Sequence, residues 1–213
     1  ETSPLGTLGT LPPHMVTAPI EERLEQKLKQ GRPPFGVELK IVDDEGSDLP
    51  NDGETSGRLM VRGPAIAAGY FKGVGGNVLD DNGFFDTGDV AHIDEYGTMT
   101  ITDRAKDVIK SGGEWISSID IENIAVGHPK VANAAAIGIY HPKWDERLLL
   151  VVQPAQGEAP TKEEVLAQLD GKIAKWWTPD DVVFVSEIPL GATGKINKLA
   201  LREQFKDYKL PTA

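Results

Sequence analysis

The stretch Asp103-Arg104-Ala105-Lys106-Asp107-Val108-Ile109-Lys110-Ser111-Gly112-Gly113-Glu114-Trp115 separates two parts of the chain that differ in character. Before it, residues 32–102 carry short apolar runs separated by close turns, which predicts a mainly β structure such as a small barrel or sheet. From residue 108, within this stretch, to residue 213, strand-like and helical patterns alternate, which predicts a small α/β domain. The fold class that we expect is therefore mixed α/β (α+β).

The β-rich part begins with residues 1–19, whose Gly, Pro and Thr content predicts a loop. A narrow helical stripe of Ile20, Leu24 and Leu28 follows, and Gly31 can end that helix. Strands are expected where β-branched or aromatic residues cluster, around residues 37–41, 59–61, 84–85, 90–93 and 98–101.

The second part contains two recognisable helix starts. Ser117-Ser118-Ile119-Asp120 can cap a helix that runs to about His128, and Thr161-Lys162-Glu163-Glu164 is a capping box. Apolar runs of strand length and apolar helical positions fill the rest, with strands expected at 134–139, 148–152 and 182–185, a helix carrying Val165, Leu166, Leu169 and Ile173, and a last helix carrying Leu201, Phe205 and Tyr208.

The composition is that of a folded globular protein, with 39 % hydrophobic residues in 213. The net charge of −11 argues against a general nucleic-acid-binding protein, because a phosphate backbone attracts an excess of Lys and Arg. The chain contains no cysteine, which excludes disulfides, zinc–thiolate sites and a cysteine nucleophile. No apolar run approaches the roughly 20 residues of a membrane span. We expect a cytoplasmic protein, with peripheral contact to a membrane left open.

A candidate nucleotide-binding carboxylate lies in Thr87-Gly88-Asp89, which we expect at the end of a strand. Asp89 could there accept two hydrogen bonds from a ribose diol. The alternative is an aspartate in an ordinary β-turn, and the tripeptide alone favours that simpler interpretation.

Three cations, Arg104, Lys106 and Lys110, lie within seven residues, just ahead of a Gly pair. Such cations stabilise phosphate charge, which is usually the largest contribution to phosphoryl or nucleotidyl transfer. The alternative is a solvated run of charges, because neighbouring aspartates offset two of the cations.

A second basic turn places Lys195 after Gly191-Ala192-Thr193-Gly194. A Walker loop requires Gly six residues before its Lys and Ser or Thr after it, and here Pro189 and Ile196 stand at those positions. We therefore expect a mobile loop that delivers one lysine, or alternatively an ordinary turn with a surface lysine. The dinucleotide-binding spacing also fails after residues 73–76, because the third Gly is missing.

The histidine and tryptophan residues do not predict a further metal-binding or base-stacking site. The four histidines, at positions 14, 92, 128 and 141, lack metal-ligand spacing and are expected in turns or in packing. Trp176-Trp177 is expected to pack in the core or between domains rather than to form a base-stacking platform.

Eight motifs follow one another at characteristic distances: Gly63-Pro64, Gly69-Tyr70-Phe71, Phe85-Asp86-Thr87-Gly88-Asp89, Asp103-Arg104-Ala105-Lys106-Asp107, Ser111-Gly112-Gly113-Glu114-Trp115-Ile116-Ser117, Ile121-Glu122, His128-Pro129-Lys130-Val131, and Pro189 with Gly194-Lys195. This ordered set resembles the C-terminal part of the adenylate-forming acyl-CoA synthetases, the superfamily that includes luciferases and nonribosomal adenylation domains. The 111–117 run and residues 141–147 are most similar to bacterial medium- and long-chain fatty acyl-CoA ligases.

The resemblance implies a domain organisation and a reaction. Residues 1–102 would be the β-rich end of a large AMP-binding domain, 103–107 a hinge, and 108–213 a C-terminal lid domain. A fatty acid would attack the ATP α-phosphate to give acyl-adenylate and pyrophosphate, and the CoA thiol would then attack the acyl carbon and release AMP. ATP, CoA and Mg²⁺ are thus the expected substrates and cofactor, the expected partners are small molecules, and a homodimer is left open.

The resemblance also implies roles for the nucleotide-facing residues. Asp89 is expected to hold the ribose, with assistance from Arg104. Lys106 is expected in the hinge about which the small domain rotates between half-reactions. Lys110 and Trp115 are expected close to the nucleotide when the lid is closed.

The remaining implied roles concern catalysis and the metal. Lys195 is expected to bridge the carboxylate and the α-phosphate during adenylation. The Gly112-Gly113 turn is expected to line the pantetheine tunnel during thioester formation. Glu1 matches a glutamate that helps to bind Mg²⁺.

The family's phosphate loop and most of its acyl pocket lie upstream of the position of Glu1, so we expect a fragment that is inactive by itself. Three rival interpretations stay open: an acyl-adenylate ligase that loads a carrier protein, a non-catalytic binding module, and an unrelated nucleotide-binding regulator. The failed Walker and dinucleotide patterns weigh against the last.

Overall fold

The computed structural model describes residue 2, residues 5–157 and residues 159–213. Contacts within the chain divide it into two compact units, Glu1–Lys106 and Asp107–Ala213. The division falls inside the segment 103–107 that was expected as a hinge, although the last strand of the first unit extends two residues into that segment. None of the helices in the described part of the chain is long and apolar enough to cross a membrane.

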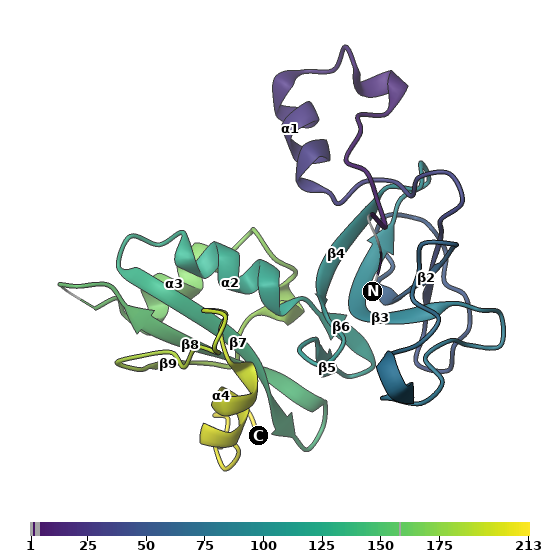
Figure 1. Ribbon diagram of the computed structural model, residues 1–213. Coiled ribbons are helices and arrows are strands. Elements are labelled where there is room, and N and C mark those ends of the chain that lie inside the picture. Colours follow the sequence, from purple (N-terminus) through teal and green to yellow (C-terminus); the bar gives the residue numbers. More distant parts are fainter. Residues whose placement is uncertain (1, 3–4, 158) are drawn as a thin grey trace. The chain divides into compact units, whose positions relative to one another are not determined.

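The first unit is built on a four-stranded antiparallel sheet with the strands in sequence order, β1 (Glu38–Val42), β2 (Gly57–Arg62), β3 (Phe85–Ile93) and β4 (Met99–Arg104) (Figure 1). One face of this sheet buries an apolar cluster that includes Ile41, Leu59 and Ile93. The neighbouring residues Val42 and Met60 point to the other face, where they form a second buried cluster with Phe84.

Strand β3 differs from the prediction of two short strands at 84–85 and 90–93. It is continuous, so Thr87-Gly88-Asp89 lies inside a strand and not at its end or in a β-turn. Gly88 adopts a φ of +71°, and side chains supply hydrogen bonds around it. The Thr87 hydroxyl donates to the Leu59 carbonyl at 2.9 Å, and the Gly88 N–H donates to an Asp86 carboxylate oxygen at 2.8 Å. These bonds carry the strand through an irregular stretch that sequence periodicity did not reveal.

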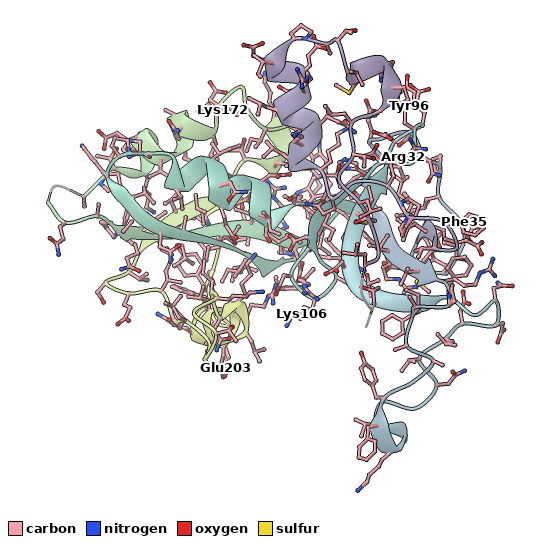
Figure 2. The ribbon with its side chains drawn as sticks, turned by 45° about the horizontal axis from the view of Figure 1, so that its top comes forward. Arg32, Phe35, Tyr96, Lys106, Lys172 and Glu203 are labelled. Carbon is pink, nitrogen blue, oxygen red and sulfur yellow. The ribbon has the colours of Figure 1, made fainter. Side chains whose placement is uncertain are left out.

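Helix α1 (Ile20–Leu28) confirms the predicted helix, and a 3₁₀ turn, η1 (Pro13–Met15), precedes it. The apolar stripe of this helix is exposed, with Leu28 80 % accessible. Gln26 is the buried residue of the helix, and its amide donates to the Thr98 hydroxyl at 3.2 Å. A second 3₁₀ turn, η2 (Phe71–Gly73), lies between β2 and β3, and exposed Phe35 lies between α1 and β1 (Figure 2).

The second unit contains a five-stranded sheet in the order β6-β5-β8-β7, with β9 parallel to β8: β5 (Ile109–Ser111), β6 (Glu114–Ile116), β7 (Val131–His141), β8 (Asp145–Pro154) and β9 (Asp181–Phe184). Helices α2 (Ser118–Val126) and α3 (Lys162–Leu169) cover one face, and α4 (Lys198–Gln204) covers the other (Figure 1). Since both faces of β7 and β8 are covered, these strands read as nearly continuous apolar runs.

Both predicted helix caps are confirmed. The Ser117 hydroxyl accepts from the Asp120 N–H at 3.3 Å, and Thr161 forms the full capping box with Glu164. The helices end earlier than predicted, so that Ile173 lies beyond α3 and Tyr208 lies beyond α4.

The β5–β6 hairpin was not predicted as a pair of strands. Its strands have three residues each, too few for an alternation of side chains to be recognised.

Candidate functional site

The first group of predicted site residues forms a cross-strand pair in the first unit. Asp89 on β3 lies opposite Arg104 on β4, and Arg104 Nε lies 2.9 Å from Asp89 Oδ1. Asp89 is the more buried partner, with 18 % of its side chain exposed against 56 % for Arg104. Beyond β4 the pairing continues through a hydrogen bond from the Ala105 N–H to the Gly88 carbonyl at 2.9 Å. Two strands therefore fix the direction of the Asp89 carboxylate.

Lys106 lies in the turn that follows β4 and is the last residue of the first unit, with an exposed side chain (Figure 2). This placement at a boundary between two compact units is compatible with a hinge, and that role remains a prediction.

The second group lies on the β5–β6 hairpin of the second unit. Lys110 on β5 is paired in register with Trp115 on β6, and the Lys110 ammonium lies 5.2 Å from the indole centroid. Gly112 and Gly113 form the turn with φ angles of +60° and +88°, in the left-handed region where a side chain is strained. The Gly112 N–H donates to the Trp144 carbonyl at 2.9 Å. The structure thus brings four of the predicted residues together on one hairpin.

Gly112 is required for space as well as for conformation. A Cβ atom added there would lie 2.8 Å from Cε3 of Trp144, whereas one added at Gly113 has no described atom within 4 Å. The two glycines of the turn therefore have different surroundings.

Lys195 lies on a different turn of the same unit. A bridge between Leu190 and Ile196 closes this turn, and the Gly191 N–H donates to the Lys195 carbonyl at 2.7 Å. Gly194 has a φ of +77°. The side chain of Lys195 is exposed, which agrees with either predicted interpretation, a delivered lysine or a surface lysine.

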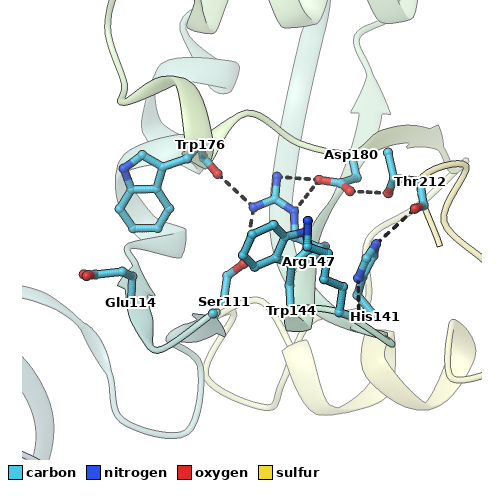
Figure 3. A pocket seen from close by; sticks show the side chains of 10 residues that line it. Ser111, Glu114, His141, Trp144, Arg147, Trp176, Asp180 and Thr212 are labelled. Atoms are coloured by element: carbon cyan, nitrogen blue, oxygen red, sulfur yellow. Dashed lines mark hydrogen bonds and ion pairs between the residues drawn. The ribbon is translucent and has the colours of Figure 1, made fainter.

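A pocket of about 850 Å³ opens beside the glycine turn (Figure 3). Its lining combines aromatic, charged and small residues of the second unit: Ser111, Gly112, Glu114, His141, Lys143, Trp144, Arg147, Trp176, Asp180 and Thr212. Trp144 and Trp176 supply flat apolar surface, and Lys143 lies over the Trp144 ring at 4.4 Å.

Arg147 organises the floor of this pocket. Its guanidinium lies 2.6 Å from Asp180 Oδ1 and donates to the Trp176 carbonyl at 2.9 Å and to the Ser111 hydroxyl at 3.3 Å (Figure 3). The Arg147 and Asp180 side chains are only 15 % and 6 % exposed. Because Asp180 neutralises it, Arg147 fixes the pocket wall rather than offering a free positive charge.

His141 closes one end of the pocket. Its Nδ1 accepts from the Lys143 N–H at 3.1 Å, so its Nε2 donates to the Thr212 carbonyl, also at 3.1 Å. This side chain is 5 % exposed, which confirms the prediction that the histidine packs.

This pocket was not predicted from the sequence. Trp177 packs against the core as predicted, whereas Trp176 is 43 % exposed and lines the pocket, so for Trp176 only packing between domains stays a prediction. The available signal was the run 141–147, which contributes four lining residues, His141, Lys143, Trp144 and Arg147.

The predicted metal ligand Glu1 lies outside the described residues. Among the residues that the structure does describe, no group of three or more His, Cys, Asp or Glu side chains could hold a metal ion.

Comparison with known families gives two matches. Residues 1–71 match the AMP-binding enzyme family, and residues 120–195 match the AMP-binding enzyme C-terminal domain. A solved structure, ATP-bound MatB from Rhodopseudomonas palustris, is 34 % identical with a TM-score of 0.73 over 85 % of this chain and 36 % of that one.

Curated relatives cover almost the whole chain. A 3-methylmercaptopropionyl-CoA ligase from Ruegeria pomeroyi is 59 % identical over 97 % of this chain and 38 % of that protein. A medium-chain-fatty-acid–CoA ligase from Ectopseudomonas oleovorans is 50 % identical over 99 % of this chain and 38 % of that protein. The chain thus spans under two fifths of the length of these relatives. From both family matches and these relatives, the chain belongs to the AMP-binding, adenylate-forming enzymes and corresponds to the C-terminal part of its acyl-CoA ligase members.

Proposed function

We propose that this chain is the C-terminal part of a longer ATP-dependent ligase that joins an aliphatic carboxylic acid to CoA through an acyl-adenylate. The observation that carries the proposal is that one compact unit contains two different candidate reaction elements. It offers an exposed lysine on one turn and, on another, a glycine turn beside a tryptophan-lined pocket.

In the first half-reaction, the substrate carboxylate attacks the α-phosphorus of ATP, and pyrophosphate leaves. The Lys195 ammonium would lie between the carboxylate and the α-phosphate and offset the negative charge that grows there, which is the kind of interaction that contributes most to such reactions. Asp89, held in direction by Arg104, would accept hydrogen bonds from the ribose hydroxyls. Lys110 and Trp115 would contact the nucleotide from the lid.

In the second half-reaction, the CoA thiolate attacks the acyl carbon. A C–S bond forms, the bond from that carbon to the AMP oxygen breaks, and AMP leaves with the electron pair. Gly112 and Gly113 present backbone without side chains, so a narrow pantetheine arm could pass close to them. The neighbouring indoles of Trp144 and Trp176 offer surfaces on which an adenine base could stack.

Several finer properties remain predictions of the resemblance. Mg²⁺ would enter with ATP, but the described residues form no metal cluster, so we assign no step to it. A homodimer and a hinge at 103–107 belong to the same group, whereas a cytoplasmic location and peripheral contact with a membrane remain predictions from the composition.

The acid is proposed only as a class. The two relatives described above are named for 3-methylmercaptopropionyl and medium-chain acyl substrates, which share an aliphatic carboxylic acid. Both acids therefore belong in the first substrate panel.

The test is pyrophosphate release by the full-length ligase with ATP, Mg²⁺ and an acid series that includes 3-methylmercaptopropionate and acids of medium and long chain. We expect acid-dependent release, followed by AMP release only when CoA is added. Acyl-adenylate that accumulates despite CoA and is consumed by a carrier protein would favour the carrier-loading alternative. No acid-dependent release with any acid would reject the ligase and leave the binding module. The isolated chain is expected to be inactive in the same assay. Orientation of the bound reactants supplies a large part of the reduction in the activation barrier, and this chain carries only part of the residues that would orient them.

A further inference from the structure

A buried lysine, Lys198, connects the helix that follows the Lys195 turn with the helix that follows the glycine hairpin. Lys198 is the first residue of α4 and is 9 % exposed. Its ammonium lies 2.7 Å from Glu122 Oε1 on α2 and donates a hydrogen bond to the hydroxyl of Ser118, the first residue of α2. Since α2 and α4 cover opposite faces of the sheet, this side chain connects the two helical layers.

The lysine end of this contact lies directly beside the Lys195 turn. Lys198 follows Lys195 by three residues. Between them, the Asn197 N–H donates to the Pro189 carbonyl at 2.8 Å and closes the turn. The Asn197 side chain also caps α4 by accepting from the Ala200 N–H at 3.1 Å. The direction of α4 therefore determines where the Lys195 turn points.

The acceptor end of the contact lies beside the glycine hairpin. Ser118 follows Ile116, the last residue of β6, by two positions. Glu122 is held in turn by β7, because its Oε1 accepts from the Ala136 N–H at 2.8 Å. The carboxylate is thus fixed from two sides, and 14 % of its side chain is exposed.

We propose that Lys198 is a positioning residue that fixes the orientation of the Lys195 turn relative to α2 and the glycine hairpin. This inference rests on the proposed function. A buried ion pair contributes little net stability compared with an apolar pair of the same shape, so we assign Lys198 the role of specifying one geometry. The glycine hairpin has further support from its β5–β6 pairing and from the Gly112–Trp144 hydrogen bond. Loss of Lys198 should therefore disturb the Lys195 turn more than the glycine turn.

The test compares the two half-reactions in the full-length ligase carrying Lys198→Met. We expect kcat for acid-dependent pyrophosphate release to fall by about 10–100-fold, since a displacement of about 1 Å can cost on the order of 10²-fold. Thioester formation from supplied acyl-adenylate should fall much less. Lys198→Arg, which keeps the positive charge on a larger and planar group, should recover part of the lost rate.

A matched control separates positioning from a loss of stability. Lys162→Met removes another lysine of this unit, one that lies 2.5 Å from the Asp181 carboxylate and joins α3 to β9. It should lower both half-reactions equally or not at all. Glu122→Gln, which keeps the shape but removes the charge, serves if Lys198→Met does not fold, and it should lower pyrophosphate release selectively.

The outcomes are distinct. Equal loss of both half-reactions in folded Lys198 and Glu122 variants would overturn the positioning role while the ligase assignment stands. Wild-type ligase without acid-dependent pyrophosphate release would reject the proposed function and this inference with it.

Discussion

The two turns of the second unit use glycine in different ways. The Gly112-Gly113 turn packs against Trp144, and a side chain at Gly112 would collide with that ring. The Lys195 turn is closed at its base by backbone hydrogen bonds and projects its lysine into solvent. One turn therefore requires the absence of a side chain at Gly112, and the other presents one exposed charge.

This difference explains how one small domain could serve two chemical steps. A turn without side chains can form the wall of a narrow passage, but it cannot supply charge. An exposed lysine on a closed turn can supply charge, but it needs a fixed base to place it. We therefore expect substitutions in the two turns to damage different half-reactions.

The largest effect is expected for Lys195→Ala in the full-length ligase. Loss of the ammonium from the developing charge should lower pyrophosphate release by about 10²–10³-fold. Thioester formation from supplied acyl-adenylate should change little. Lys172→Ala, which removes another exposed lysine of the same unit, is the control and should leave both rates unchanged. Normal pyrophosphate release by Lys195→Ala would show that Lys195 is an ordinary surface lysine without a role in adenylation.

The next effect concerns the glycine pair. In Gly112→Ala and Gly113→Ala, the alanine must adopt the left-handed backbone conformation, which costs of order 1–3 kcal/mol. Only in Gly112→Ala does the new Cβ atom also lie 2.8 Å from Cε3 of Trp144. Single-turnover thioester formation should therefore fall further in Gly112→Ala than in Gly113→Ala, with adenylation preserved in both. Equal effects at the two positions would show that contact with Trp144 is unimportant.

A smaller effect is expected in the first unit. Asp89→Asn keeps the shape of the side chain but removes the charge that pairs with Arg104. It would also weaken the hydrogen bonds that we propose Asp89 accepts from ribose. The KM for ATP should rise by roughly 10-fold, corresponding to about 1.4 kcal/mol. An unchanged KM for ATP with correctly folded protein would contradict the assignment of Asp89.

The smallest effect concerns stability at high pH. The hydrogen bond from Tyr208 to Asp181 raises the pKa of Tyr208 to about 12. Burial raises the pKa of Asp181, but hydrogen bonds from Lys162 and Tyr208 outweigh burial and lower it. Since the Tyr208 pKa is higher in the folded state, its contribution is complete below pH ~10 and is lost as the pH rises towards 12.

Urea unfolding between pH 9 and 12 measures this loss. Tyr208→Phe should remove the alkaline step, whereas Tyr140→Phe, at a position 75 % exposed on β7, should retain it. An identical alkaline step in wild type and Tyr208→Phe would contradict the assignment to Tyr208.

The sequence predicted the elements whose signals are local. The caps at Ser117 and Thr161 depend on residues within one helical turn, and the long apolar strands β7 and β8 depend on burial of both faces. The continuous β3 could not be predicted, because Gly88 and the hydrogen bonds of Thr87 and Asp86 maintain it without periodicity.

The candidate site was predictable where a motif contains it. Lys110, Gly112 and Trp115 come from one run and lie on one hairpin. The pocket joins residues from β5, β8 and the segment before β9, including Trp176 and Asp180, so only the folded chain brings them together. The contact of Lys198 with Glu122 spans 76 positions and has no local pattern at all.

The most direct test of a division of labour between the two turns measures both half-reactions in two variants of the full-length ligase, Lys195→Ala and Gly112→Ala. Pyrophosphate release reports adenylation, and single-turnover acyl-CoA formation from supplied acyl-adenylate reports thioester formation. If the two turns serve different half-reactions, adenylation is lost in Lys195→Ala and thioester formation is lost in Gly112→Ala. Loss of the same half-reaction, in the same proportion, in both folded variants would contradict this division of labour.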